Sequence, residues 1–383
     1  MRTDVLVVGG GPSGSRAAQL LARQHDVLLA EEHLTPGEPL QCAGLVTRRG
    51  IPSFAERCIL GEIRGAKLHS PLGFTLTLES KTSRACVIDR QQFDRLMFHR
   101  AVEAGAEPVL GAPVISLSDR GRSVEFRLRT DHRTREGSAE AVIGADGYKS
   151  LCRRVARVRA PRHMLTGIQA DLKGTHFDPD FVELYFGRNV APGFFAWAIP
   201  AEDLVRVGLC TWNSDLPPAV YLRKLLSRPE FTKGSKVSLV AGKIPIGSSK
   251  RAVRGRIALV GDAASHAKPL SGGGVYTGVR GAELCAEACA RFLDGDGVLE
   301  DYDAMWWDEF GREISKAFRI RRIFLELTDS KLDKALRVFA EPDVRSLLES
   351  RGDIDYPASL SSAVLKLAPK LAQFSPQIVK SFL

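Results

Sequence analysis

The sequence predicts an α/β protein with two β-sheet domains and a helical C-terminal region, and three patterns support this prediction. Residues 5–8 form an apolar strand that leads into a glycine-rich turn and a helix, and a second apolar strand at 27–30 completes a Rossmann-like βαβ unit. Alternating apolar residues over 63–79 and strand-like runs over 165–245 indicate a second, mixed sheet. From residue 299 onward the spacing of apolar residues is mostly helical.

Length and composition indicate a soluble protein of more than one domain. At roughly 150 residues per domain, 383 residues predict two to three domains. The chain is 44% hydrophobic and 26% charged, and no apolar run approaches the ~18 residues that a membrane-spanning helix needs. The first residues lack the charged leader and cleavage site of a secretory signal, so we expect a cytoplasmic protein. Seven cysteines without a CxxC pair favour a reducing compartment, and no metal site is predicted.

The formal charge of +9 favours anionic partners. The basic residues are scattered and no zinc or RNA-recognition signature accompanies them, so we predict no nucleic-acid partner. A cofactor pyrophosphate or an anionic lipid surface accounts for the charge equally well.

The opening turn has the spacing of a dinucleotide-binding fold. It reads Gly9-x-Gly11-x-x-Gly14, with Pro12 and Ser13 between the last two glycines. Such glycines allow a tight turn and a close approach of the backbone to a pyrophosphate, which then meets the helix N-terminus. A purely structural glycine-rich turn is the alternative.

Two carboxylates at strand ends predict which dinucleotide binds. Glu31 ends the second strand and can accept hydrogen bonds from ribose hydroxyls. A later buried-type strand ends at Gly261-Asp262, and the loop Gly272-Gly273-Gly274 then opens a helix at Val275. A second carboxylate and a helix N-terminus beside a flat ring suit FAD, because the positive end of the helix stabilises negative charge on a reduced flavin. The alternative is that Asp262 only caps a helix.

Four ordered motifs resemble the fingerprints of group A flavoprotein oxidoreductases, which have the p-hydroxybenzoate hydroxylase fold: the opening glycines, Ile88-Asp89-Arg90-x-x-Phe93-Asp94, Gly144-Ala145-Asp146-Gly147 and Gly261-Asp262. Within that group, three segments are similar to the geranylgeranyl reductase family, which includes archaeal digeranylgeranylglycerophospholipid reductases. These segments are Gln41-Cys42-Ala43-Gly44-Leu45, the block from Pro192 to Pro200, and Gly352-Asp353-Ile354-Asp355-Tyr356-Pro357.

The resemblance implies an FAD enzyme that saturates isolated C=C bonds of isoprenoid chains. It places Cys42, Ala43 and Gly44 near the flavin, with Cys42 as the catalytic candidate; a buried, inert cysteine is the alternative. It also implies a lipid pocket lined by Phe194, Phe195, Trp197, Ile199 and Pro200. Phe195 stands where the family has tyrosine and Ile199 where it has phenylalanine, so chain length or degree of saturation can differ. An aromatic strip that is only part of the core remains the alternative.

The domain boundaries follow from these motifs. We expect a discontinuous FAD-binding domain of residues 1–61, 87–160 and 250–298 with an inserted substrate domain of 62–86 and 161–249. Residues 299–383 form the helical C-terminal region.

For three further features the sequence leaves two interpretations open. Arg90 begins a helix and can meet cofactor phosphates or the flavin edge, or form an ordinary salt bridge. Asp146 and Gly147 can support the cofactor or simply form a turn. The tail from Leu360 to Leu383 carries lysines among apolar residues, and can lie peripherally on a membrane or dock onto its own domain.

The function we expect is hydride transfer from reduced flavin N5 to one alkene carbon, with a proton reaching the other. Cys42, by way of a water, is the candidate proton donor. The substrate is an isoprenoid lipid or a prenyl diphosphate, as in archaeal-type membrane lipid biosynthesis. Because only one dinucleotide fingerprint is present, NADPH, NADH or a small redox protein could deliver electrons transiently. The alternatives are an FAD monooxygenase or halogenase, since residues 195–200 resemble a halogenase block, and a non-catalytic flavin- or lipid-binding protein.

Overall fold

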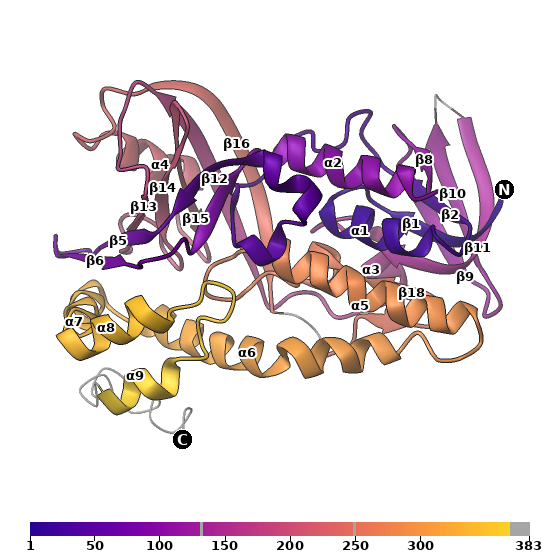
Figure 1. Ribbon diagram of the computed structural model, residues 1–383. Helices are drawn as coiled ribbons and strands as arrows, with labels where there is room; N and C mark the ends of the chain where they lie inside the picture. The colour runs from indigo at the N-terminus through magenta and orange to yellow at the C-terminus, as the bar shows by residue number, and fades with distance from the viewer. Residues whose placement is uncertain (131–132, 248–249, 368–383) are drawn as a thin grey trace.

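The computed structural model describes residues 1–130, 133–247 and 250–367. Within them the chain forms two large sheets, a small third sheet and a set of helices (Figure 1). This α/β architecture with a helical C-terminal region confirms the predicted fold class.

The first sheet has a parallel centre that begins with the predicted βαβ unit. Its order is β17-β18-β11-β1-β2-β8, with β10 and β9 added beside β11. The strands are β1 (Arg2–Val8), β2 (Val27–Ala30), β8 (Glu107–Val109), β9 (Val114–Asp119), β10 (Val124–Thr130), β11 (Arg133–Gly144), β17 (Val253–Arg254) and β18 (Ile257–Leu259). Val8 lies opposite both Ala30 and Gly144, and Gly144 lies opposite Leu259. Four parallel strands therefore end at one edge, where α/β folds bind ligands.

The second sheet is antiparallel except where β13 and β5 run parallel. Its order is β16-β12-β15-β14-β13-β5-β6. The strands are β5 (Gly65–His69), β6 (Thr75–Glu79), β12 (His163–Lys173), β13 (Phe181–Tyr185), β14 (Ala196–Ala201), β15 (Leu204–Thr211) and β16 (Ser235–Ile246). The hairpin predicted within 63–79 is β5–β6.

A three-stranded sheet joins the two large ones. It consists of β3 (Leu45–Val46), β4 (Ile59–Ile63) and β7 (Ala85–Ile88). Ile63, Ala85 and Val87 pack with Val182 and Ile199 of the second sheet in one buried cluster. This apolar junction fixes the small sheet against the second sheet.

Helices cover the first sheet and extend under the second. Short 3₁₀ turns lie at Arg48–Gly50, Ser53–Cys58 and Gly261–Ala264, and the helices are α1 (Pro12–Leu21), α2 (Arg90–Glu103), α3 (Leu151–Val155), α4 (Pro218–Leu226), α5 (Val275–Leu293), α6 (Asp301–Glu326), α7 (Asp329–Phe339), α8 (Pro342–Arg351) and α9 (Ser361–Leu367). The long α6 runs beneath both domains, and α7 and α8 lie beside the β5–β6 hairpin (Figure 1). Among the described residues, no helix is long and apolar enough to cross a bilayer.

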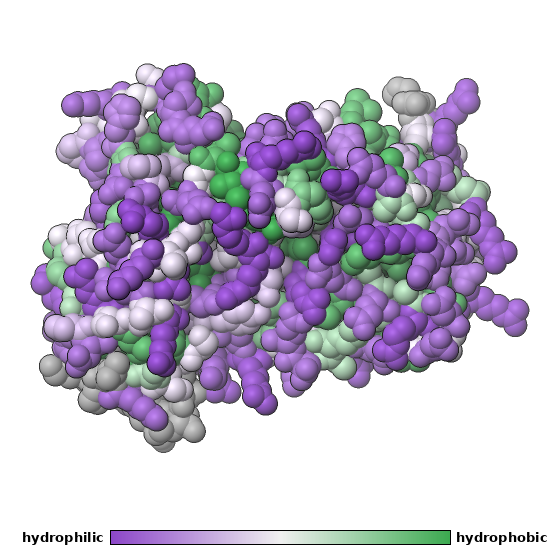
Figure 2. Space-filling view, in the orientation of Figure 1, coloured by the Kyte–Doolittle hydropathy of each residue, from purple (hydrophilic) through white to green (hydrophobic). Residues whose placement is uncertain are grey.

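The surface in the same orientation is mostly hydrophilic, with apolar residues in small scattered groups (Figure 2). The larger apolar side chains are inside. Phe93 on α2, for example, is fully buried in a cluster with Cys58, Ile88 and Met97. This cluster packs α2 against the small third sheet.

We expect the substitution Phe93→Ala to lower the free energy of unfolding by about 3–5 kcal/mol, because it removes a buried ring and leaves a cavity. The urea-denaturation midpoint measures the change. His99 is exposed on the same helix, so His99→Ala is the matched control and should change stability by less than about 0.5 kcal/mol. Equal effects of the two substitutions would contradict this packing.

Candidate functional site

The turn between β1 and α1 has the geometry that a pyrophosphate requires. Gly9 has a φ of +101°, and a Cβ there would lie 2.4 Å from the carbonyl oxygen of Ala145. A Cβ on Gly14 would lie 1.9 Å from the Gly9 carbonyl oxygen, whereas one on Gly11 would meet no described atom within 4 Å. Gly11 is also the N-cap of α1, and no described side chain caps that helix end. The turn therefore leaves open backbone N–H groups facing free space.

Glu31 lies beside this turn at the carboxyl end of β2. Its Oε2 accepts a hydrogen bond from the Gly10 N–H at 2.7 Å, and its Oε1 accepts one from the His33 N–H at 2.9 Å. The carboxylate is thus fixed at the strand edge. Its role in binding ribose stays a prediction.

The second predicted turn meets the first. A Cβ on Gly261, whose φ is +60°, would lie 2.8 Å from the Ser13 Oγ, so α1 and the Gly261–Ala264 turn pack closely. Gly274 is the N-cap of α5, again without a side-chain cap among the described residues, and Asp262 Oδ1 lies 3.6 Å from the position of a Gly274 Cβ. Two uncapped helix N-termini and a carboxylate therefore converge, which fits FAD.

Asp262 has a perturbed ionisation. Burial raises the pKa of Asp262 to about 6, and the positive charge of Arg90 opposes this shift. Asp262 is therefore a carboxyl group that changes its protonation state near pH 6. It lies close to the N-terminus of α5, the helix that we predict to meet the flavin.

Arg90 forms an ion pair and also reaches the Cys42 loop. Its Nε and Nη2 donate to the two carboxylate oxygens of Asp94 at 3.0 and 2.9 Å. Burial alone would lower the pKa of Arg90, but Asp94 and Cys42 raise it above its ordinary value through charge and hydrogen bonding. The helix-start salt bridge is thus present, and Cys42 lies beside its guanidinium group.

The loop from Cys42 to Gly44 is held between the domains. The Gly44 N–H donates to Cys42 Sγ at 3.3 Å, and Arg206 of β15 donates to the Ala43 carbonyl at 2.8 Å. Gly44 has a φ of +76°, and a Cβ there would lie 2.7 Å from the Ile88 carbonyl oxygen and 2.2 Å from Arg206 Nη1. The positive φ and the close backbone oxygen favour glycine at this position, and Arg206 holds the loop from the second sheet.

The predicted aromatic block lies on the side of the second sheet that faces this loop. Phe194 and Phe195 stack with ring centroids 4.2 Å apart, and Phe195 meets Trp197 edge-on at 6.4 Å. The ring of Phe194 comes within 3.2 Å of the position of a Gly272 Cβ. Ile199 instead packs into the junction cluster, and Pro200 is half-buried. The aromatic strip is partly core, and its Phe194 end reaches the glycine loop.

Trp197 is fixed by a residue that sequence reasoning missed. Its indole ring packs directly on Gly208 of the neighbouring strand β15, where a Cβ would come within 2.6 Å of the ring. The indole Nε1–H donates to Gln169 Oε1 at 3.1 Å, and the Gln169 amide donates to Asp171 at 3.1 Å. A glutamine and an aspartate within an apolar strand were the available signal, because such residues in a core need partners.

The remaining predicted residues have local roles in the structure. Asp146 accepts a hydrogen bond from the Ser150 hydroxyl at 2.6 Å and one from the Cys152 N–H at 3.0 Å, which caps α3. Gly147 has a φ of +67° in the same turn. Their contact with a cofactor stays a prediction. The predicted membrane tail lies largely outside the described residues, which end at 367.

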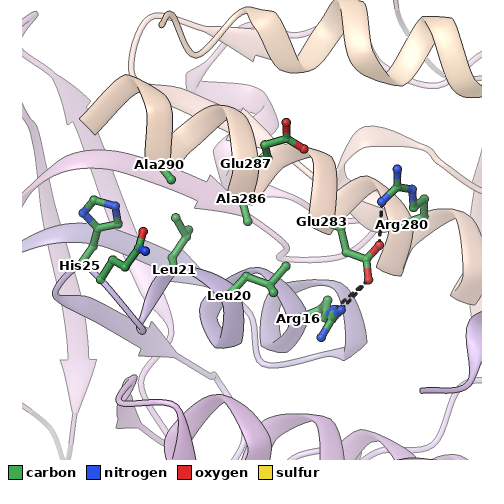
Figure 3. Close-up of a pocket in the computed structure, with 10 residues that line it drawn as sticks. Arg16, Leu20, Leu21, His25, Arg280, Glu283, Ala286, Glu287 and Ala290 are labelled. Atoms are coloured by element: carbon green, nitrogen blue, oxygen red, sulfur yellow. Dashed lines mark hydrogen bonds and ion pairs between the residues drawn. The ribbon is translucent and has the colours of Figure 1, made fainter. Parts of the chain in front are cut away.

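A surface groove between α1 and α5 is separate from this site (Figure 3). One part of it is closed by ion pairs of Glu283 with Arg16 at 2.7 Å and with Arg280 at 2.9 Å. None of its ten lining residues is a predicted site residue.

Comparisons with known proteins extend these findings. A family model described as an FAD binding domain matches residues 2–223. The digeranylgeranylglycerophospholipid reductase 1 of Methanococcoides burtonii is 30% identical over 397 residues, which cover 98% of this chain and 96% of that protein.

Two solved structures share the fold. A geranylgeranyl bacteriochlorophyll reductase-like protein from Thermoplasma acidophilum superposes with a TM-score of 0.86 at 24% identity, covering 99% of this chain and 98% of that one. The flavin-dependent halogenase CmlS gives a TM-score of 0.72 at 18% identity and covers 99% of this chain and 78% of its own. At these identities the likeness concerns the fold alone.

We expect FAD affinity to fall as the pH drops through 6, because the ionised form of Asp262 accepts a hydrogen bond from a ribityl hydroxyl more strongly than the protonated form does. If the protonated form binds poorly, the Kd at pH 5 should be about tenfold higher than at pH 8. The effect of pH on the folding stability of the unliganded protein has the opposite sign. Because the pKa of Asp262 is raised in the folded state, folding favours the protonated carboxyl, and this stabilisation is lost as the pH rises through 6. Calorimetric titration of the apoprotein with FAD measures the affinity.

Asp262→Asn should bind FAD weakly at both pH values, and Asp343→Asn, at an exposed position, should keep the profile of the unmodified protein. A pH-independent affinity in the unmodified protein would show that Asp262 does not contact the cofactor.

Proposed function

We propose a function from the premise that the chain belongs to the geranylgeranyl reductase family of FAD-dependent oxidoreductases. It is an FAD-dependent reductase that acts on C=C bonds. Its substrate is a geranylgeranyl chain of an isoprenoid ether lipid. One observation carries the assignment of the pocket: the aromatic block and the flavin-cradling glycine loop meet at Phe194 and Gly272.

Bound FAD supplies the reducing chemistry, a hydride delivered from N5 to one alkene carbon while a proton reaches the other. The chain's own residues bind and orient the cofactor. The N-termini of α1 and α5 would hold its negatively charged groups, and Asp262 would accept a hydrogen bond from one of its hydroxyl groups. Arg90 contributes a guanidinium beside Cys42, held in position by Asp94.

The aromatic block holds the hydrocarbon and excludes water. Phe186 extends the strip toward α6, with its ring centroid 5.9 Å from Phe195 and 6.3 Å from Phe324. A pocket of this kind favours an isoprenoid chain through apolar burial and offers no hydrogen bond to a polar substrate. Phe195 has no hydroxyl, so this position shapes the pocket and does not carry a proton.

The proton donor we propose is Cys42, acting through a water. Its side chain is half-buried in a loop and lies next to the Arg90 guanidinium. The electron donor, NADPH, NADH or a small redox protein, reaches the flavin transiently. A peripheral contact with the membrane would supply the lipid.

The test is an anaerobic single turnover. FAD-loaded protein is reduced with dithionite, mixed with a digeranylgeranylglycerol phospholipid or with geranylgeranyl diphosphate, and followed by flavin absorbance and lipid mass spectrometry. We expect reoxidation with a gain of two mass units for each saturated bond. A flavin that stays reduced with both lipids until oxygen enters would overturn the proposal and favour a monooxygenase.

We expect Cys42→Ala to slow lipid-dependent reoxidation by at least about tenfold while FAD binding is retained, because general acid catalysis typically contributes 10²–10⁴-fold. Cys289→Ala is the matched control. Cys289 is fully buried on α5, and burial raises its pKa to about 12, so its loss should leave the rate within about twofold. Equal rates for both variants would remove Cys42 from the mechanism.

A further inference from the structure

The loop that cradles the flavin is tied to the C-terminal region by a buried ion pair. Lys268 Nζ and Asp355 Oδ1 lie 2.5 Å apart, and their side chains are only 7% and 1% exposed. Lys268 Nζ also donates to the Ile354 carbonyl at 3.1 Å. The two partners are separated by most of the C-terminal helices in the sequence, so the pair joins distant parts of the chain.

Lys268 belongs to the same loop as Gly272–Gly274. Its backbone N–H donates to the Gly273 carbonyl at 3.0 Å, and its carbonyl accepts from the Gly272 N–H at 2.9 Å. The side chain then runs along the loop, because a Cβ on Gly273 would lie 3.2 Å from Lys268 Cε and 3.5 Å from Nζ. The ammonium group therefore lies against the Gly272–Gly274 loop.

Asp355 also holds the loop that follows Cys42. Its Oδ2 accepts a hydrogen bond from the Thr47 hydroxyl at 2.6 Å and lies 3.5 Å from Arg49 Nη1. Arg49 is itself paired more closely with Asp353, at 2.8 Å. Tyr356 extends the contact, with its hydroxyl 3.1 Å from that of Tyr276 in the first turn of α5. The segment 353–356 thus touches both loops and the helix end that form the flavin site.

We propose that the Lys268–Asp355 pair sets the reduction potential of the bound flavin, with Lys268 as the charge that favours reduction and Asp355 as its counter-charge. This inference rests on the proposed function only in that FAD is taken to lie on the Gly272–Gly274 loop. Both residues are positioning residues, because they act on the ring through the loop and through their field. They form no contact with a substrate.

The physical reason is the sign of the charge. Reduction makes the isoalloxazine ring more negative, so a nearby positive charge stabilises the reduced state and a negative charge destabilises it. Charges buried in protein are screened much less than exposed ones. Removing Asp355 leaves the Lys268 charge without its carboxylate partner, and removing Lys268 leaves Asp355 with only the more distant Arg49, at 3.5 Å. The two removals therefore change the local charge in opposite directions.

The experiment measures the midpoint potential of the FAD-loaded protein by anaerobic dye equilibration at pH 6.5. Asp355→Asn should shift the oxidised-to-reduced equilibrium about tenfold toward the reduced flavin, which is ~30 mV more positive for a two-electron couple. Lys268→Gln should shift it about tenfold in the opposite direction. The double variant, in which neither charge remains, should return close to the unmodified protein.

Three controls separate charge from structure. Lys268→Arg keeps the charge and should keep the potential. Asp353→Asn weakens the same segment, where Asp353 Oδ1 accepts hydrogen bonds from the backbone N–H groups of Asp355 and Tyr356, but leaves both charges of the buried pair in place. FAD affinity and the melting temperature of each variant report any loss of fold. If the Asp355→Asn variant does not yield folded protein, the midpoint potentials of Lys268→Gln and Lys268→Arg are compared instead.

Shifts in the same direction for both single variants, or no shift in either, would overturn the inference and leave the pair a mechanical tie. No isoprenoid is present in this measurement. A protein that shows the opposite shifts but reduces no isoprenoid lipid would therefore keep the inference while the proposed function fails.

Discussion

The whole site depends on how closely backbone can approach backbone at the carboxyl edge of the first sheet. Gly9 sits against the carbonyl of Ala145, and Gly14 sits against the carbonyl of Gly9, at distances that leave no room for a Cβ. These contacts bring α1 down onto the ends of β1 and β11. Because β2 and β18 end at the same level, Glu31 and Asp262 reach one edge without any long side-chain extension.

The second constraint is the contrast between the two halves of the site. On the side of the first sheet, open backbone N–H groups and carboxylates make a polar surface for a charged cofactor. On the side of the second sheet, Phe194, Phe195 and Trp197 make an apolar one. Arg206 crosses between them and holds the Ala43 carbonyl, so the domains cannot separate without breaking a hydrogen bond of a largely buried arginine. A reductase of hydrocarbon chains needs both halves at one point, because its cofactor is charged and the part of the substrate that reacts is an apolar chain.

Local features of the site could be predicted from the sequence, and long-range ones could not. The glycine spacing after β1 predicts a turn, because φ values such as that of Gly9 exclude most other residues. The helix that starts at Arg90 and the hairpin around Pro71 follow from apolar period and turn residues. The partners of Trp197, Ala43 and Lys268 lie far away in the chain, and nothing in a local pattern specifies them. Ile199 illustrates the limit: an apolar residue in an aromatic strip suits a pocket or a core, and tertiary packing places it in the junction.

The contact between Phe194 and the Gly272 loop also bears on how this enzyme can evolve. The Phe194 ring rests directly on the backbone of the Gly272 loop, which we propose to hold the flavin, with no intervening side chain to absorb a change. Under the proposed function, a substitution at Phe194 that altered the accepted chain would move or release that backbone as well. Substrate range and cofactor geometry are therefore not separate traits at this position, and new lipid preferences are more accessible through the Phe186 and Phe324 end of the strip.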